Sequence, residues 1–371
     1  MSNLLELGKS LHKRKYRSDI DGIRAIAVVL VLICHAFPKY LPGGFIGVDI
    51  FFVISGYLIT LILINNFEKN NFSIINFYKR RILRIFPALL IVFVFILFLG
   101  WLFLFKLEFL ALGKHITSST LFVENLILWS ESSYFDTSSE LKPTLHLWSL
   151  AIEEQFYIFW PLIIYLSFKF RFKLLFTIAG LFLISFSINL YDISNNPTAA
   201  YYSPLGRSWE LLVGAMLAYF QKYNIFTSAK FENLKSSLGL ALIAIGLILT
   251  KPEQNFPGFM ALFPTIGTAL LISAGNNAWI NRRILSLQPM VFVGLISYPL
   301  YLWHWPFISF AYIIFGGLSF KMALLCMLAS FLAAYLTFIW VEKPLRTKWN
   351  EVGKVRILAV SMVGILDLLR K

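Results

Sequence analysis

Long runs of apolar residues alternate with short polar segments along almost the whole chain. A run of about 20 apolar residues is long enough to cross the hydrocarbon core of a membrane as an α-helix. We expect about ten spans, at 23–38, 45–65, 87–107, 148–167, 172–190, 207–221, 236–250, 260–275, 289–315 and 321–341, and a partial eleventh in 357–369. The pattern therefore predicts an all-α fold, a polytopic membrane helical bundle.

The polar breaks divide the chain into one large unit and a short C-terminal segment. We expect residues 1–346 to form a single membrane domain, in which short connections make sequential helices neighbours. Residues 347–371 are expected to form a cytoplasmic linker and the start of the eleventh span. The longer segment 114–148 is partly apolar and is expected to pack back against the helices.

Composition supports a membrane protein. The 371 residues are 58% hydrophobic and only 14% charged, whereas a soluble domain carries about a quarter charged residues. The first 20 residues lack the short apolar stretch and cleavage site of a secretory signal, so the first span is expected to remain as an anchor.

The net charge of +14 reflects the distribution of Lys and Arg among the loops. With a cytoplasmic N-terminus, the inner segments hold 23 Lys and Arg residues and the outer segments hold six. This bias predicts the N-in orientation. The excess charge is expected to attract anionic membrane lipids, and no nucleic-acid partner is expected. Cys34 and Cys326 lie inside apolar runs without metal-ligand spacing, so we expect no disulfide and no metal.

The first apolar run carries Arg24 at one end and His35 near the other. Eleven residues are three helical turns plus about 20°, so the two side chains share a helix face about 16 Å apart. Ionisable groups at membrane depth face a cavity or a partner. The alternatives are a local ion pair of Arg24 with Asp21 and a core role for His35.

Further polar residues interrupt the runs that follow. Gly43, Gly44 and Gly47 permit close backbone approach, and Asp49 in the same run needs a partner or water. The stretch "FYKRRILRIFP" places arginines at the inner surface. Their planar guanidinium groups can donate paired hydrogen bonds to phosphate groups. These arginines are Arg80, Arg81 and Arg84. A positive-inside cluster without a ligand is the alternative.

Later runs repeat the pattern of charged residues within apolar sequence. Glu153 and Glu154 open an apolar helix and point about 100° apart, so one of them should turn inward. Arg207 and Glu210 are spaced i,i+3 in another run. In "SYPLYLWHWP", residues 297–306, a histidine lies between two tryptophans and two prolines are expected to break the helix, as is tolerated beside a cavity. Together these features predict a polar chamber with a basic inner gate.

The sequence resembles acyltransferase family 3, integral-membrane acyltransferases that modify bacterial cell-envelope sugars. The resemblance runs from about residue 16 to residue 346. It is carried by "DGIRAIAVVLVLICH", "GGFIGVDIFFVISGYLIT", "FYKRRILRIFP", "HLWSLAIEEQFY", "RSWELLVG", "SYPLYLWHWP" and "VEKPLR". It implies transfer of an acyl group, usually acetyl, from cytosolic acetyl-CoA to a sugar hydroxyl on the outer side of the inner membrane.

The resemblance also implies roles for residues of this chain. Its arginine-to-histidine motif corresponds to Arg24 and His35, and we expect His35 to act as general base. Its inner motif corresponds to Arg80, Arg81 and Arg84, which with Arg24 are expected to hold the CoA phosphates, and its acidic motif to Glu153 and Glu154. Either of these carboxylates or Asp49 is expected to orient His35. Direct transfer, a covalent acyl-histidine and a relay through Tyr134 remain open.

One feature separates this chain from many relatives it resembles. Those ending in "VEKPLR" continue into an SGNH hydrolase-like domain, and no Gly-Asp-Ser motif occurs before Lys371, so such a partner domain is expected to be missing or separate. The acceptor glycan and the acyl length stay open. The alternative functions are a transporter or flippase of an envelope precursor, and a sensor or scaffold with an inactive site.

Overall fold

The computed structural model describes residues 16–69, 72–132, 137–225, 231–251 and 256–348, and these residues contain helices and turns but no strand. The longer helices are α2 (Ser18–Ala36), α3 (Gly47–Glu68), α4 (Ile74–Phe103), α5 (Lys106–Thr120), α7 (Leu147–Lys169), α8 (Leu174–Asn195), α10 (Pro204–Lys222), α11 (Glu232–Leu249), α12 (Leu262–Ala274), α14 (Ser297–Phe315) and α15 (Phe320–Thr337). The shorter ones are η1 (Pro42–Ile46), α6 (Glu124–Glu131), η2 (Ser139–Leu141), α9 (Pro197–Tyr202), η4 (Gly258–Ala261), η5 (Asn281–Leu285), α13 (Gln288–Leu295), η6 (Phe338–Glu342) and α16 (Lys343–Lys348). The all-α prediction is confirmed over the described residues.

Each of the ten predicted apolar runs coincides with a helix or, at 289–315, with α13 and α14. Judged only by length and composition, five of the described helices are long and apolar enough to cross a membrane. The number is six if the bent pair α13 and α14 is one span. The predicted count of about ten spans is therefore not confirmed. The partial eleventh run at 357–369 lies outside the described residues.

The predicted broken helix is present, but it does not break at a proline. α13 and α14 are bent by 67° relative to each other, with Ile296 between them. Pro299 is the third residue of α14, where a missing N–H costs little because the first turn has no intrahelical acceptors for its donors. Pro306 lies within α14 and does not end it. The bend places the first turns of α14 in the interior of the bundle.

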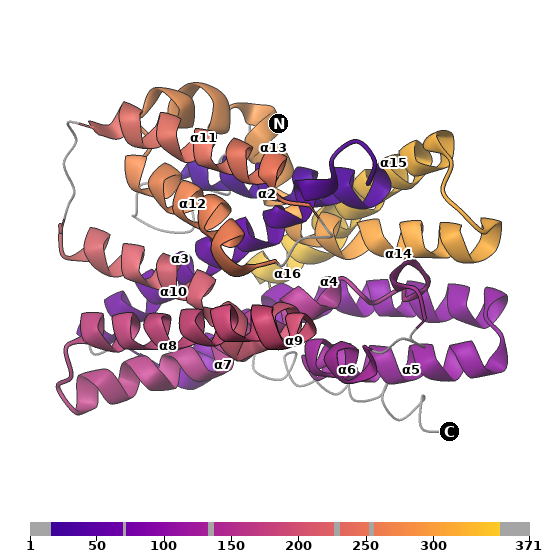
Figure 1. Ribbon diagram of the computed structural model, residues 1–371, viewed down its shortest axis with the longest axis horizontal. Coiled ribbons are helices and arrows are strands. Elements are labelled where there is room, and N and C mark those ends of the chain that lie inside the picture. Colours follow the sequence, from indigo (N-terminus) through magenta and orange to yellow (C-terminus); the bar gives the residue numbers. More distant parts are fainter. Residues whose placement is uncertain (1–15, 70–71, 133–136, 226–230, 252–255, 349–371) are drawn as a thin grey trace.

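Figure 1 shows α2 and α3 running through the middle of the molecule with other helices around them. α3 packs against α2, α7, α10 and α12. Glycines allow the closest approaches: a Cβ atom at Gly47 would lie 2.3 Å from the Ala27 carbonyl oxygen, and one at Gly44 would lie 2.3 Å from the Leu30 carbonyl oxygen. The expected close backbone approach after His35 is confirmed.

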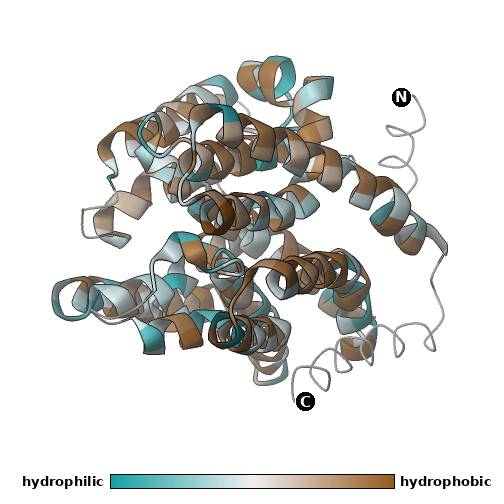
Figure 2. Cartoon of the chain, turned by 90° about the vertical axis from the view of Figure 1, so that its right-hand side faces the viewer, coloured by the Kyte–Doolittle hydropathy of each residue, from teal (hydrophilic) through white to brown (hydrophobic). Residues whose placement is uncertain are grey.

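The outward surfaces of the helices are rich in large hydrophobic residues. Figure 2 shows hydrophobic colouring along most helices, with hydrophilic residues more frequent near turns. Trp101, Phe176, Ile248 and Leu325 are 64% to 75% exposed. An apolar surface of this extent is stable against lipid rather than water. The bundle is that of a membrane protein.

Candidate active site

Two cavities lie along α2, one near each end of the helix. We call the first the arginine cavity, because Arg24 of α2 and Arg81 and Arg84 of α4 line it. Its volume is about 160 Å³, and Glu153 and Glu154 of α7 also line it. Three guanidinium groups and two carboxylates therefore line the same small cavity.

The charged groups of the arginine cavity make specific contacts. Arg24 Nη1 lies 3.4 Å from Asp21 Oδ1, so the local pairing considered from the sequence is present, yet Arg24 also faces the cavity. The Arg81 guanidinium lies over the Tyr157 ring at 5.1 Å. Glu153 accepts hydrogen bonds from the hydroxyls of Tyr157 and of Ser55, the latter at 2.7 Å. The carboxylate of Glu153 is thus fixed in place by neutral donors.

Glu154 differs from its neighbour. Its side chain is buried and lines the same cavity, but Oε1 has no hydrogen-bond partner among the described residues. A buried carboxylate oxygen without a partner is costly. This oxygen is therefore free to accept a hydrogen bond from a bound molecule.

The second cavity is the histidine cavity, with a volume of about 540 Å³. His35 and His146 line it together with aromatic side chains, which are Trp148, Tyr201, Tyr202, Tyr301, Trp305, Phe45, Phe256 and Tyr312. Val48 and Tyr301 line both cavities, so the two share a wall about one residue thick. In place of the one predicted polar chamber, the structure has two compartments that meet at Val48 of α3 and Tyr301 of α14.

His35 contacts a second histidine. His35 Nδ1 lies 2.9 Å from His304 Nε2, and His304 Nδ1 lies 2.6 Å from the Tyr301 carbonyl oxygen. The edge of Trp305 packs against the His35 ring, with centroids 4.7 Å apart. No carboxylate among the described residues hydrogen-bonds His35, so the expectation that Asp49, Glu153 or Glu154 orients it does not match this geometry.

Asp49 is instead part of a buried ion cluster. Arg207 Nη2 lies 3.0 Å from Asp49 Oδ1, and Arg207 Nη1 lies 3.2 Å from Glu210 Oε1. All three side chains are at most 1% exposed, and none lines either cavity. The partner that Asp49 needs in the membrane is Arg207, which places Asp49 in a structural role.

The remaining predicted residues lie in different settings. Arg80 is exposed on α4 and does not line the arginine cavity, because Arg81 and Arg84, not Arg80, turn inward. Tyr134 lies outside the described residues. Within the described ranges, no group of three or more His, Cys, Asp or Glu side chains is arranged to hold a metal ion.

Sequence reasoning did not assign roles to His304 and His146. His304 lies 269 positions from its partner His35, and helical periodicity carries no signal for a contact of that range. His146 precedes α7, is 2% exposed, and neither of its ring nitrogens has a hydrogen-bond partner in the described part of the chain. Its ring faces that of His304 edge to face, with centroids 5.4 Å apart.

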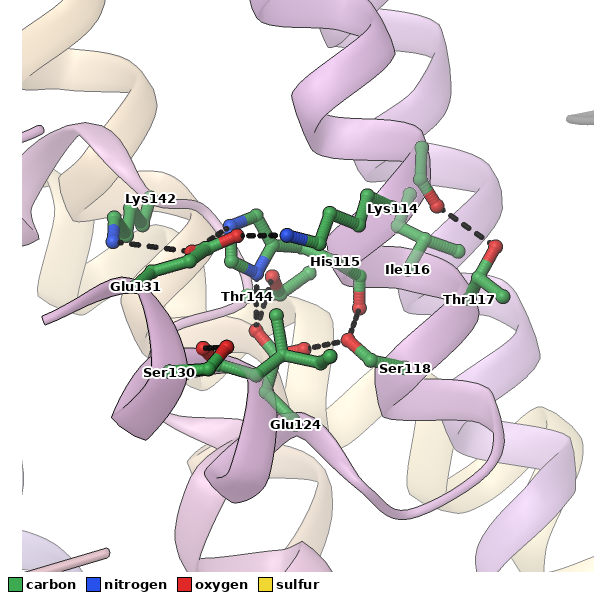
Figure 3. A network of polar contacts seen from close by, with 12 residues as sticks. Lys114, His115, Ile116, Thr117, Ser118, Glu124, Ser130, Glu131, Lys142 and Thr144 are labelled. Carbon is green, nitrogen blue, oxygen red and sulfur yellow. Dashed lines mark hydrogen bonds and ion pairs between the residues drawn. The ribbon is translucent and has the colours of Figure 1, made fainter. Parts of the chain in front are cut away.

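Figure 3 shows a separate charged cluster on α5, α6 and the segment after η2, and none of its charged residues lines either cavity. His115 bridges two carboxylates, with Nδ1 3.0 Å from Glu124 and Nε2 3.1 Å from Glu131. Lys114 Nζ lies 2.6 Å and Lys142 Nζ 3.5 Å from Glu131. Burial raises the pKa of Glu131, but hydrogen bonding from Lys114 and the neighbouring positive groups hold that pKa below its ordinary value. The cluster ties the segment 114–148 together, and α6 packs against α7 and α9 as expected.

The fold and the two cavities define a helical membrane protein with an arginine-lined cavity and a histidine-lined cavity inside the bundle. Residues 17–341 match the family described as acyltransferase domain, and the chain belongs to this family, acyltransferase family 3. The family prediction made from the motifs is confirmed.

Several curated proteins are similar to the chain. It is 34% identical to a peptidoglycan O-acetyltransferase, OatA, of Listeria monocytogenes, over 96% of this chain and 64% of the relative. It is 31% identical to an O-acetyltransferase, OatA, of Staphylococcus aureus, over 92% of this chain and 59% of the relative. It is also 34% identical to a putative peptidoglycan O-acetyltransferase, YrhL, of Bacillus subtilis, over 92% of this chain and 56% of the relative. The chain thus spans less than two thirds of the length of these relatives, and no solved structure matches it.

Proposed function

We propose that this chain is a membrane-bound O-acetyltransferase that moves an acetyl group from cytosolic acetyl-CoA to a hydroxyl group of peptidoglycan on the outer side of the bacterial cytoplasmic membrane. The observation that carries the proposal is the shared wall of the two cavities at Val48 and Tyr301. In the proposal, the donor extends from the arginine cavity past Val48 and Tyr301 into the histidine cavity, where its thioester meets the acceptor beside His35. The acceptor class is taken from the names of the relatives.

The arginine cavity suits the donor. CoA carries phosphates at one end and a thioester at the end of a long, slender arm. In the proposal, Arg24, Arg81 and Arg84 hold the phosphates at the cavity mouth, since guanidinium forks match phosphate oxygens. The narrow cavity then takes the arm, which leads toward His35. Arg80 would add long-range attraction from the surface.

The histidine cavity suits a sugar. Its aromatic walls offer flat apolar faces for the C–H groups of a sugar ring, and its polar atoms can bind hydroxyls. In the proposed reaction His35 takes the proton of an acceptor hydroxyl while that oxygen bonds to the thioester carbon. The carbon–sulfur bond then breaks, and the proton on His35 passes to the departing CoA sulfur. The products are the acetyl ester and free CoA thiol, and His35 returns to its neutral form.

The test is acetyl transfer by purified protein in lipid nanodiscs, with labelled acetyl-CoA and peptidoglycan fragments. The variant His35→Ala should lose about 100-fold or more in turnover, the usual contribution of a general base. Its binding of acetyl-CoA should stay within about twofold of the unmodified protein, because phosphate contacts supply most of the affinity. Tyr40→Phe is the control, since Tyr40 is 76% exposed at the end of α2 and lines neither cavity.

Near-normal turnover by His35→Ala would contradict the proposal. Failure of the unmodified protein to consume acetyl-CoA in the presence of any peptidoglycan fragment would favour the alternative of a transporter or flippase, because transport leaves the thioester intact.

A further inference from the structure

The hydrogen-bond chain that ends on the Tyr301 carbonyl has a defined direction. A carbonyl oxygen only accepts hydrogen bonds. The contact of 2.6 Å from His304 Nδ1 to this oxygen therefore places a proton on Nδ1 of His304. A neutral imidazole carries one N–H, so Nε2 of His304 has a lone pair and can only accept.

The next contact follows from the first. His304 Nε2 lies 2.9 Å from His35 Nδ1, so the proton between them belongs to Nδ1 of His35. His304 is 1% exposed and none of the described carboxylates contacts it, which disfavours a second proton and its charge on that ring. His35 Nε2 is then the unprotonated nitrogen, and it has no hydrogen-bond partner among the described residues.

The ring geometry supports this assignment. The His35 and His304 rings are parallel within 1°, with centroids 5.2 Å apart. An N···N distance of 2.9 Å is shorter than stacked ring faces can approach, since non-bonded atoms prefer about 3.5 Å or more. The rings therefore lie side by side in nearly one plane. In that arrangement the N–H of His35 points along the lone pair of His304, which is the direction of a good hydrogen bond.

We propose that His304 is a positioning residue that fixes the tautomer and the ring orientation of His35, so that Nε2 of His35 is the atom that takes the acceptor proton. This inference rests on the proposed function for its catalytic consequence. Orientation by a neutral imidazole tied to a backbone carbonyl avoids placing another carboxylate in the membrane interior, where a charge is costly. When His35 takes the proton at Nε2, its Nδ1–H stays bonded to His304, and no proton needs to leave the pair.

The tautomer is measured directly by ¹⁵N NMR of histidine-labelled protein in nanodiscs, because protonated and bare ring nitrogens have well-separated shifts. Difference spectra against His35→Ala assign the signals of His35. We expect a protonated Nδ1 and a bare Nε2 for His35, and a mixture of both tautomers in His304→Ala. A protonated Nε2 in the unmodified protein, or an unchanged His35 pattern in His304→Ala, would overturn the inference.

Enzyme kinetics distinguish the loss of a residue that positions His35 from a general disturbance of the fold. His304→Ala should lower kcat about 10- to 100-fold, the range for losing a partner that orients an imidazole, with KM for acetyl-CoA unchanged within about twofold. His304→Gln should recover part of that loss, because its side-chain oxygen can accept the His35 Nδ1–H. Ser309→Ala is the matched control: Ser309 is a buried polar residue of the same helix that donates to the Glu140 carbonyl oxygen at 2.7 Å, outside the histidine pair.

If kcat falls equally in His304→Ala, His304→Gln and Ser309→Ala, the cause is a general disturbance of α14. That result would refute the proposal that His304 positions His35. The two proposals fail independently. An active His35→Ala together with the expected tautomer would remove the proposed function alone, whereas an inactive His35→Ala with the opposite tautomer would remove this inference alone. If His304→Ala does not fold, the tautomer of the unmodified protein and the His304→Gln variant still decide the question.

Discussion

Arg81 and Arg80 are adjacent in sequence but differ in what they face. Arg81 lines the arginine cavity and lies over the Tyr157 ring, whereas Arg80 is exposed on the surface of α4 and does not line the cavity. A turn of 100° per residue is enough to separate a cavity residue from a surface residue. The pair therefore tests whether phosphate binding needs the cavity or only positive charge at the membrane surface.

We predict that Arg81→Gln raises KM for acetyl-CoA about tenfold, corresponding to loss of about 1.4 kcal/mol from a charge-assisted contact. Arg80→Gln should raise it less than about twofold at physiological salt, where exposed charges are screened. Steady-state kinetics of both variants, repeated with a short thioester that lacks the nucleotide, give the measurement. Equal effects on CoA and on the short thioester would contradict a phosphate contact for Arg81.

Glu131 of the charged cluster on α5 and α6 has a shifted pKa. Its pKa is held below its ordinary value of 4.5, because positive groups outweigh the effect of burial. A carboxyl with a lowered folded-state pKa stabilises the fold above its unfolded pKa, and that stability is lost as pH falls through the folded pKa. The stabilisation by Glu131 is thus complete at neutral pH and disappears below about pH 4.5.

Thermal unfolding of Glu131→Gln and of the unmodified protein at about pH 7 and at several values below about pH 4.5 checks this prediction. We expect the variant to melt at a lower temperature near neutrality, and the difference to shrink as the pH falls. A difference in melting temperature that stays constant with pH would show that the charge of Glu131 contributes nothing.

At the scale of helices, backbone contact between α3 and α10 sets the centre of the bundle. A Cβ atom at Gly56 would lie 1.8 Å from the Leu211 carbonyl oxygen, and one at Gly214 would lie 2.0 Å from the Val53 carbonyl oxygen. Such distances are far below van der Waals contact with a rigid backbone. Small residues of this kind let helices approach closely in a membrane, where packing replaces the hydrophobic effect.

We predict that Gly56→Ala lowers the free energy of unfolding by about 1–3 kcal/mol, since α3 and α10 must move apart. Gly180→Ala in α8 is the matched control, because nothing lies within 4 Å of a Cβ atom there. That substitution should be neutral or stabilise by up to about 1 kcal/mol through helix propensity. Denaturation in mild detergent compares the two variants, and equal stabilities would refute the packing argument.

The broken helix shows how an element serves the site. The bend between α13 and α14 brings the first turns of α14 against α2, where Tyr301 lines both cavities and His304 meets His35. The Tyr301 hydroxyl donates to the His146 carbonyl oxygen at 2.6 Å, which ties α14 to the start of α7. A straight span through residue 296 would carry these side chains elsewhere.

At the scale of the whole molecule, the proposal makes the reaction directional across the membrane. The predicted spans place 23 basic residues on the expected inner side and six on the outer side. In the proposed N-in orientation, Arg24 faces the cytoplasm and His35 faces the outer side. The donor and the acceptor then enter from opposite faces, and only the acetyl group crosses between them.

Sealed proteoliposomes of defined orientation test this direction. We predict product when acetyl-CoA is confined to the face carrying the N-terminus and peptidoglycan fragments to the other face. The reverse distribution of the two substrates should yield less than about a tenth of that product, because polar substrates do not cross the ~30 Å hydrocarbon core. Product formed only when both substrates share the N-terminal face would contradict the transmembrane arrangement.

The sequence by itself determined the helical class, the positions of the apolar helices, the family and the placement of Arg24 and His35 on one helix. These features depend on local periodicity and on motifs, which are contained in short stretches of sequence. The i,i+3 pair of Arg207 and Glu210 was readable for the same reason.

Only the tertiary structure decided which polar groups meet. Asp49 joins Arg207, 158 residues away, and not His35, while His35 joins His304, 269 residues away. Partner choice among buried polar groups depends on helix packing and on the bend at Ile296, and neither leaves a periodic signal in the sequence. Charged groups are costly in a membrane interior without a partner, and the packing that pairs Asp49 with Arg207 leaves His35 in contact with another imidazole.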